Sequence, residues 1–177
     1  MQKLSKEGVS LTDKVIVSEN NANAQIDSQS AAMQDGNVFV VWSDNSGTLG
    51  DQEAGSIKGR VIRPDGTFAT AEFLINSDIT GDQIKPIVHS LNANQVFVAW
   101  SNSTDQGASE IRGMVVNNDG SLGSNEFKIA SSSVASNVLF KDIVVLPDNR
   151  LVLGWYNHAS DAADRTSYTT NFFPLGR

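Results

Sequence analysis

Oxygen-bearing side chains gather in the polar loops that follow three tryptophans, and their chemistry is that of calcium ligands. The loop after Trp42 is the richest, because it offers Asp44, Asn45, Asp51 and Glu53. Calcium binds carboxylate, amide and backbone carbonyl oxygens, which acidic loops with glycine can supply. The loop lacks the ligand spacing of an EF-hand. The sequence therefore predicts an irregular calcium site here, with solvated turns as the alternative.

Aromatic side chains at strand ends form a second group that could bind a ligand. Trp42, Trp100 and Trp155 each end an apolar run, and Tyr156 follows at the start of a loop. Exposed aromatic rings can stack on sugars, so these four residues are the predicted glycan contacts. The alternative for the tryptophans is packing inside the fold, because they stand in its most apolar strands.

Groups for catalysis are sparse. His89 and His158 are the only histidines, and no Gly-x-Ser-x-Gly turn presents a nucleophile. Two histidines without any cysteine also leave too few preferred ligands for zinc. The sequence predicts a protein that is not an enzyme and that holds no cofactor other than the calcium considered above.

A sequence unit that occurs three times must position these groups. Each unit carries an apolar run ending in tryptophan, and a turn cluster before that run predicts a hairpin. The turn glycines Gly8, Gly66, Gly120 and Gly176 lie 58, 54 and 56 residues apart. We therefore divide a single repeat domain, residues 1–177, into units at about 9–66, 67–120 and 121–176.

Each unit offers four short strands and no helical periodicity. Seven residues after three of the turn glycines another strand begins, at Val15–Ser18, Phe73–Asn76 and Phe127–Ala130. The apolar run must have both faces covered, which stacked sheets provide. Lys58 and Arg60 alternate on a later strand, and we expect them to protect an exposed outer edge. The predicted fold is all-β, with three four-stranded antiparallel blade-like repeats.

The second unit resembles a known repeat family. Its strand Phe73 to Asn76, the Gly81-Asp82-Gln83 segment with Pro86, and the Val-Phe-Val-x-Trp run at 96–100 look like the β-propeller-type blade repeats of very large secreted or surface-attached bacterial proteins. That family commonly accompanies calcium-binding or adhesive modules. The segment 103–107, Ser-Thr-Asp-Gln-Gly, also resembles the Asp-box, which is a structural turn in sialidases and related propellers.

Three units are too few for an ordinary closed propeller, which has four to eight blades. The chain could belong to a longer propeller, or two copies could close a six-bladed ring as a homo-oligomer. A β-trefoil, which also has three four-stranded repeats, is the alternative fold.

Composition restricts the partners. The formal charge is −7 and basic residues are scattered, which argues against nucleic acid. No apolar run is long enough to cross a membrane. We expect a non-catalytic extracellular or cell-surface binding or structural module of a larger bacterial protein, with a glycan or protein ligand. A small multivalent glycan-binding propeller is the alternative, and a glycoside hydrolase fragment is a weaker one.

Overall fold

The computed structural model describes residues 1–50, 55–103, 109–132, 136–146, 150–159 and 168–174, and these residues form strands and no helix. Sheet 1 contains β1 (Gln25–Ala32), β2 (Val38–Asp44), β3 (Ser56–Ile62) and β4 (Phe73–Leu74). Sheet 2 contains β5 (Asp82–Ser90), β6 (Gln95–Ser103), β7 (Ser109–Asn117) and β8 (Phe127–Ser131). Sheet 3 contains β9 (Ser136–Val145), β10 (Arg150–Ala159) and β11 (Tyr168–Pro174). The all-β prediction is confirmed.

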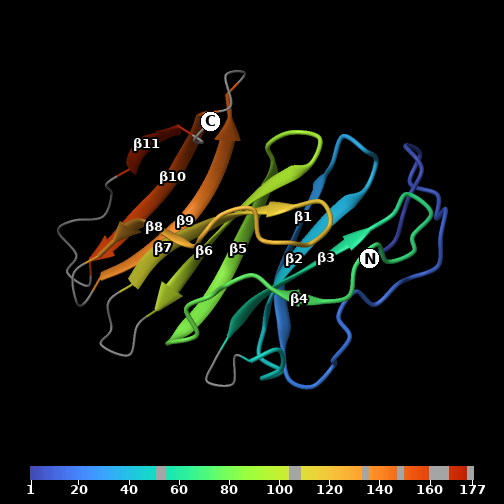
Figure 1. Cartoon of the computed structure of the whole chain (residues 1–177), viewed down its shortest axis with the longest axis horizontal. Coiled ribbons are helices and arrows are strands. Elements are labelled where there is room, and N and C mark those ends of the chain that lie inside the picture. Colours follow the sequence, from blue (N-terminus) through green and yellow to red (C-terminus); the bar gives the residue numbers. More distant parts are fainter. Residues whose placement is uncertain (51–54, 104–108, 133–135, 147–149, 160–167, 175–177) are drawn as a thin grey trace.

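Strands adjacent in the sequence pair in antiparallel fashion in every sheet (Figure 1). The predicted hairpins close with the same backbone hydrogen bond in all three units. Met33 N–H donates to the Asn37 carbonyl at 2.9 Å, and Leu91 and Leu146 do the same toward Gln95 and Arg150. Sheets 1 and 2 are therefore four-stranded meanders, as the sequence predicts.

The grouping of strands differs from the expected one by one strand. Phe73 pairs with Gly59 in β3, so β4 is the last strand of sheet 1 and not the first strand of the next unit. Val15–Ser18, predicted as a strand, is not one, because only Val15 makes a strand-like pair, with Met1. Among the described residues sheet 3 has three strands, where four were expected.

The three open sheets pack face to face in a row, with the N-terminal segment at one end and sheet 3 at the other (Figure 1). Phe39 and Val41 of sheet 1 share a core with Val98 and Trp100 of sheet 2. On its other face, sheet 2 packs Phe97 and further side chains against sheet 3. Contacts between neighbouring sheets concentrate on β5 and β9, the first strand of each later sheet.

These two cores explain why the central strands are apolar at consecutive positions. β2 turns Phe39 and Val41 toward sheet 2, while Val40 and Trp42 point to the opposite face under Val17. Successive side chains in a strand point to opposite faces, so a strand covered on both sides buries every residue. The seven residues of β2 are buried except for Val38, which is half-buried.

A β-bulge recurs in the first strand of each sheet. The pairing register slips between Ile26 and Gln29 in β1, between Ile84 and Ile87 in β5, and opposite Gly154 and Trp155 in β9. Asp27 and Lys85, which lie at the same position in their units, both have a φ of 54°. A bulge bends and twists its strand, so each sheet curves at the same place.

Candidate functional site

The three tryptophans lie in the packed interior. Trp42 is 3% exposed, Trp100 0% and Trp155 7%, which leaves no ring face open to a sugar. Trp100 and Trp155 pack toward the preceding sheet, and Trp42 lies under the N-terminal segment. The three tryptophans therefore pack inside the fold, which was the alternative to sugar binding in the sequence analysis. Tyr156 lies in β10, but its side chain is outside the described residues.

The structure describes two of the four predicted calcium ligands, Asp44 and Asn45. Asp44 is buried, and its Oδ1 accepts a hydrogen bond from Lys58 Nζ at 2.8 Å. Asn45 uses its backbone to bond Ala24 and Asn23, while Asp51 and Glu53 lie outside the described residues. No group of three or more histidine or acidic side chains that could hold a metal occurs in the part of the chain that the structure describes.

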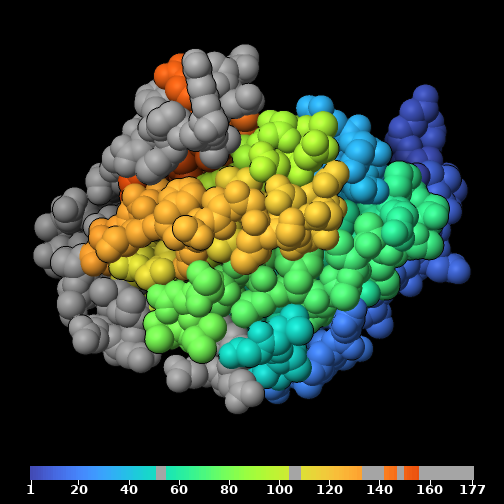
Figure 2. All heavy atoms as spheres, in the orientation of Figure 1, coloured from blue at the N-terminus to red at the C-terminus, as the bar shows by residue number. Residues whose placement is uncertain are grey.

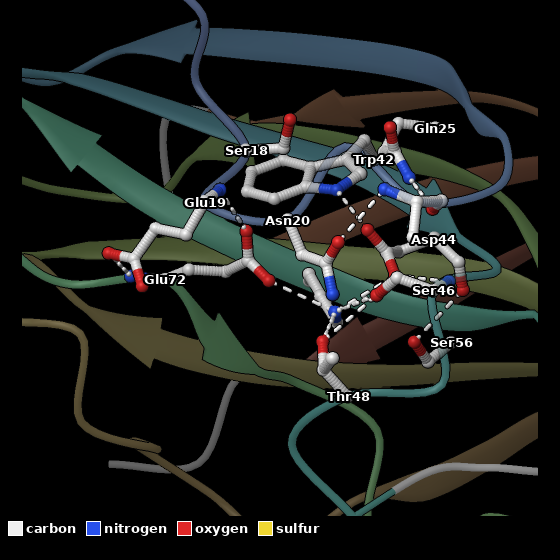
Figure 3. Close-up of polar contacts among 12 residues, drawn as sticks. Ser18, Glu19, Asn20, Gln25, Trp42, Asp44, Ser46, Thr48, Ser56 and Glu72 are labelled. Atoms are coloured by element: carbon white, nitrogen blue, oxygen red, sulfur yellow. Dashed lines mark hydrogen bonds and ion pairs between the residues drawn. The ribbon is translucent and has the colours of Figure 1, made fainter.

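Lys58 is instead the centre of a buried ion cluster. Figure 3 shows its partners Asp44, Glu72, Ser46 and Thr48 gathered around one point. It stands opposite Trp42 in the β2–β3 register, and its side chain is 0% exposed. Its ammonium contacts Asp44 at 2.8 Å and Glu72 at 3.0 Å, and it donates to the hydroxyls of Ser46 and Thr48. Burial of an unpaired charge costs roughly several kcal/mol, so the buried Lys58 ammonium requires these carboxylate and hydroxyl partners.

This position corrects a sequence expectation. Lys58 and Arg60 were expected on an exposed outer edge, but β3 is an inner strand with β2 on one side and β4 on the other. Arg60 is only 8% exposed. The repeated glutamates Glu72 and Glu126 are the signal that could have revealed the cluster, since they stand at the same distance before the fourth strand in both units.

The cluster continues into the N-terminal segment. Glu72 Oε2 accepts from the backbone N–H of Glu19 at 2.8 Å, and Glu19 Oε1 accepts from that of Glu72 at 3.1 Å. Arg60 donates to Glu19 and to the Val17 carbonyl, both at 2.8 Å, and its guanidinium lies 3.4 Å from the centre of the Phe68 ring. These bonds tie the segment around Val17 to sheet 1.

The surroundings of Asp44 hold it in the charged form. Burial by itself raises the pKa of this carboxyl, but hydrogen bonds from Lys58, Ser46 and Trp42 outweigh that effect and lower the pKa below its usual range. Both carboxylate oxygens are in use, because Oδ2 accepts from the Trp42 indole N–H at 3.2 Å. An acid or base needs a free position toward a substrate, and Asp44 has none.

Sheet 2 repeats the arrangement with an arginine. Arg112 occupies the position of Lys58 and contacts Glu110, Glu126 and Asp78 within 2.9 Å. Glu126 Oε2 accepts from the backbone N–H of Ser77 at 2.7 Å, as Glu72 does from Glu19. The shared geometry is a cation in the third strand and a glutamate that holds the preceding connection. Two occurrences favour a structural role over chemistry.

A surface hollow of about 660 Å³ lies beside the cluster. Its apolar lining includes Trp42, Val40, Val15 and Val17, and its polar lining comes largely from β1. Ser28 and Ser30 take the places that Pro86 and Val88 occupy in β5. The hollow is thus a mixed surface on the face of sheet 1 that points away from sheet 2.

The remaining sequence candidates add no further site among the residues that the structure describes. His89 pairs through Nδ1 with the Ser90 carbonyl at 2.9 Å, and the side chain of His158 is not among the described ones. Most of the Asp-box-like segment, residues 104–107, also lies outside the described residues. No helix among the described residues is long and apolar enough to cross a membrane. No protein-family model matches the chain, and no curated protein matches it.

Proposed function

We propose that the chain is a non-catalytic repeat module with blade-like sheets, working as an extracellular binding or structural segment of a larger bacterial secreted or surface protein. The observation that carries this proposal is the repetition of one structural unit in sheets 1 and 2, with the same order, hairpins and ion-pair position. Repetition of this kind serves extended scaffolds, where each unit packs on its neighbours.

The arrangement of the sheets supports blades over a trefoil. Neighbouring sheets approach through β5 and β9, the first strand of each later sheet, while the fourth strands β4 and β8 lie at sheet edges. Propeller blades meet in the same way around their common axis. The secreted bacterial setting rests on the resemblance of the segment from Phe73 to Trp100 to surface-protein repeats.

The use of the polar groups supports the absence of catalysis. The buried Lys58 is paired with both Asp44 and Glu72, and Arg112 is paired with three carboxylates. Catalytic groups usually retain a free position in a cleft.

A small glycan-binding protein is the second candidate, and the hollow beside Trp42 favours it. Its volume of about 660 Å³ falls in the range of small-ligand sites, and Gln25, Gln29 and two serines of β1 offer amide and hydroxyl groups to sugars.

A glycan array separates the two functions. A structural module gives no specific signal, whereas a lectin gives one that Gln29→Ala and Ser30→Ala reduce. Ser121→Ala, in an exposed turn away from the hollow, is the matched control. Specific binding that survives the hollow variants and is lost in Tyr156→Ala would place the sugar at the predicted aromatic site instead. Turnover of any glycoside in a hydrolase panel would contradict the absence of catalysis.

Thermal melts with calcium and with chelator test the cofactor. A bound ion raises the melting temperature by mass action. We expect calcium to leave it unchanged, because Lys58 already neutralises Asp44.

A further inference from the structure

The N-terminal turn is the same structure as two later turns. Isolated bridges join Leu4 to Ser10, Ile62 to Phe68 and Val116 to Leu122. In each turn the glycine has positive φ, at 81° for Gly8, 91° for Gly66 and 85° for Gly120, and its N–H donates to the carbonyl three residues before it. Residues 1–18 thus share this turn with the last part of a unit and stand at the sequence positions that run from its third strand to its fourth.

The residues that follow this turn stand where a fourth strand stands. Val15 and Ile16 are at the positions of Phe73 and Leu74, 58 residues earlier. Val15 exchanges two backbone hydrogen bonds with Met1, of 2.8 and 2.6 Å, and Met1 occupies the position that Gly59 has opposite Phe73. Val15 therefore already pairs with a residue at the third-strand position.

Sheet 3 lacks such a fourth strand among the described residues. In its order β11-β10-β9, the strand β11 corresponds to β3 and β7, and no described strand pairs with its outer edge. Thr169 stands opposite Trp155, as Lys58 stands opposite Trp42. By the same register, Thr170 takes the position of Gly59, which β4 pairs through Phe73.

Residue sizes at one position support this correspondence. In sheet 1, Phe39 and Phe73 pack edge to face over Gly59, where an added Cβ would lie 3.1 and 3.2 Å from the two rings. In sheet 2 the trio is Phe97, Phe127 and Gly113. The positions in sheet 3 and the N-terminal segment hold Val152, Val15 and Thr170. Two valines replace the two phenylalanines and a threonine replaces the glycine, so the total side-chain volume of the three positions stays similar.

We propose that the edge of β11 takes the segment Val15–Ser18 of a second copy of this chain, with Val15 opposite Thr170 and Ile16 opposite Thr169. The two surfaces lie at opposite ends of the row of sheets (Figure 1), so one chain cannot join them by itself. Figure 2 shows the N-terminal segment, in blue, at the end of the molecule beyond sheet 1. On pairing, β11 of one copy replaces Met1–Leu4 of the other copy as the neighbour of Val15–Ser18. All four residues of Met1–Leu4 are exposed, so their displacement costs little packing.

The exchange replaces the pairing bonds of Val15 and covers apolar surface, at the loss of bonds such as that from the Leu11 N–H to the Lys3 carbonyl at 2.8 Å. The two bonds between Met1 and Val15 are replaced by bonds to a strand that is already held in a sheet. The outward face of sheet 3, where Val144 is 49% exposed and Val152 is half-buried, comes to lie over the hollow beside Trp42. Pairing and sugar binding in the hollow therefore exclude one another. The inference rests on the blade-like repeat of the proposed function and not on its ligand.

Cross-linking between single-cysteine variants tests the pairing, because the chain has no cysteine of its own. Val15→Cys and Thr170→Cys are purified separately, mixed and oxidised with diamide, which takes up the two electrons and two protons of the thiols. We expect a disulfide-linked species of twice the 19.0 kDa chain mass. The mixture of Val9→Cys, exposed in the N-terminal turn, with Thr170→Cys is the control and should give no such product.

Solution mass provides the second measurement. The unchanged chain should exceed the monomer mass as its concentration rises to about 100 µM, and deletion of residues 2–4 should shift association to lower concentration because the competing segment is gone. Val15→Pro removes the pairing N–H from a surface segment and should restore the monomer. A monomer throughout together with equal cross-linking in the Val9 control would overturn the inference. A flat glycan array would leave it intact, so the two proposals fail separately.

Discussion

Lys58 illustrates what a residue type can and cannot reveal. A lysine that alternates with Arg60 in a short strand is normally a solvent-exposed residue, and exposure was the expectation. Strand order decides otherwise, because β4 covers the edge that the sequence left open. The pairing of β4 with β3 depends on contacts across the turn at Gly66, which local sequence patterns do not encode. The repeated positions of Glu72 and Glu126 were the only local hint.

Lys58→Met should destabilise the protein strongly. The substitution leaves Asp44 and Glu72 buried without their cation, and breaking such a pair costs about 3–5 kcal/mol. Urea denaturation followed by fluorescence measures the change in unfolding free energy. Lys128→Met is the matched control, because Lys128 is 55% exposed in its contact with Glu110 and should change stability by about 0–1 kcal/mol. Equal effects for the two variants would show that the cluster does not stabilise the fold.

The same cluster predicts acid sensitivity. The pKa of Asp44 in the folded chain lies below its ordinary value of 3.8, so the unfolded chain binds the proton more readily. The stability that this group contributes is therefore complete above that value and is lost as pH falls through the lowered pKa. The difference in unfolding free energy between the unchanged chain and Asp44→Asn should shrink below about pH 4. A difference that stays constant from neutral to acidic pH would contradict this account.

Strands and hairpins were largely predictable, because their signals are local. The runs ending at Trp42 and Trp100 and the turns after Met33 and Leu91 lie where expected. The bulges were missed, since Asp27 and Lys85 share a left-handed backbone but no residue type. The grouping of β4 and β8 with the strands before them was missed as well. A repeat in sequence fixes the spacing of strands but not where one sheet stops and the next begins.

Close packing at a strand glycine gives a test at the level of the element. A Cβ on Gly113 would lie 2.6 Å from Phe97 Cζ and 2.9 Å from Ile129 Cδ1. Gly113→Ala should cost about 1–3 kcal/mol of stability, measured by chemical denaturation. Gly154→Ala is the control, because its nearest neighbour would be 3.9 Å away. Adding Phe97→Leu to Gly113→Ala should recover part of the loss; no recovery would mean that the phenylalanine ring is not the obstacle.

At the scale of the whole molecule, the sequence predicted stacked sheets because the runs around Val40, Val98 and Leu153 are apolar on both faces. The two cores between the sheets confirm this prediction. The polar outer face of sheet 1 was not predicted, although Ser28 and Ser30 replace Pro86 and Val88. The effect of these two serines depends on which face of β1 packs against another sheet, and the tertiary packing of the sheets decides that.

The row of sheets predicts unequal stability along the chain. Sheet 2 packs on both faces, whereas sheets 1 and 3 each have one neighbouring sheet. In stacked repeats the terminal units open first. Variants that retain one tryptophan, with phenylalanine at the other two positions, report each region separately by fluorescence in urea. The midpoint for Trp100 should be the highest, and coincident midpoints for Trp42, Trp100 and Trp155 would indicate a single cooperative unit instead.

The enclosure of Lys58 also has a chemical consequence. An amine-acylating reagent must reach the lysine nitrogen from solvent, and Lys58 is closed to it in the folded chain because its side chain is 0% exposed and bonded to two carboxylates. Lys6, whose side chain is 92% exposed, reacts freely by comparison. The rate at which Lys58 is labelled, measured by mass spectrometry of the peptides, therefore reports how often sheet 1 opens completely. The labelling of Lys6 is the reference for an exposed lysine.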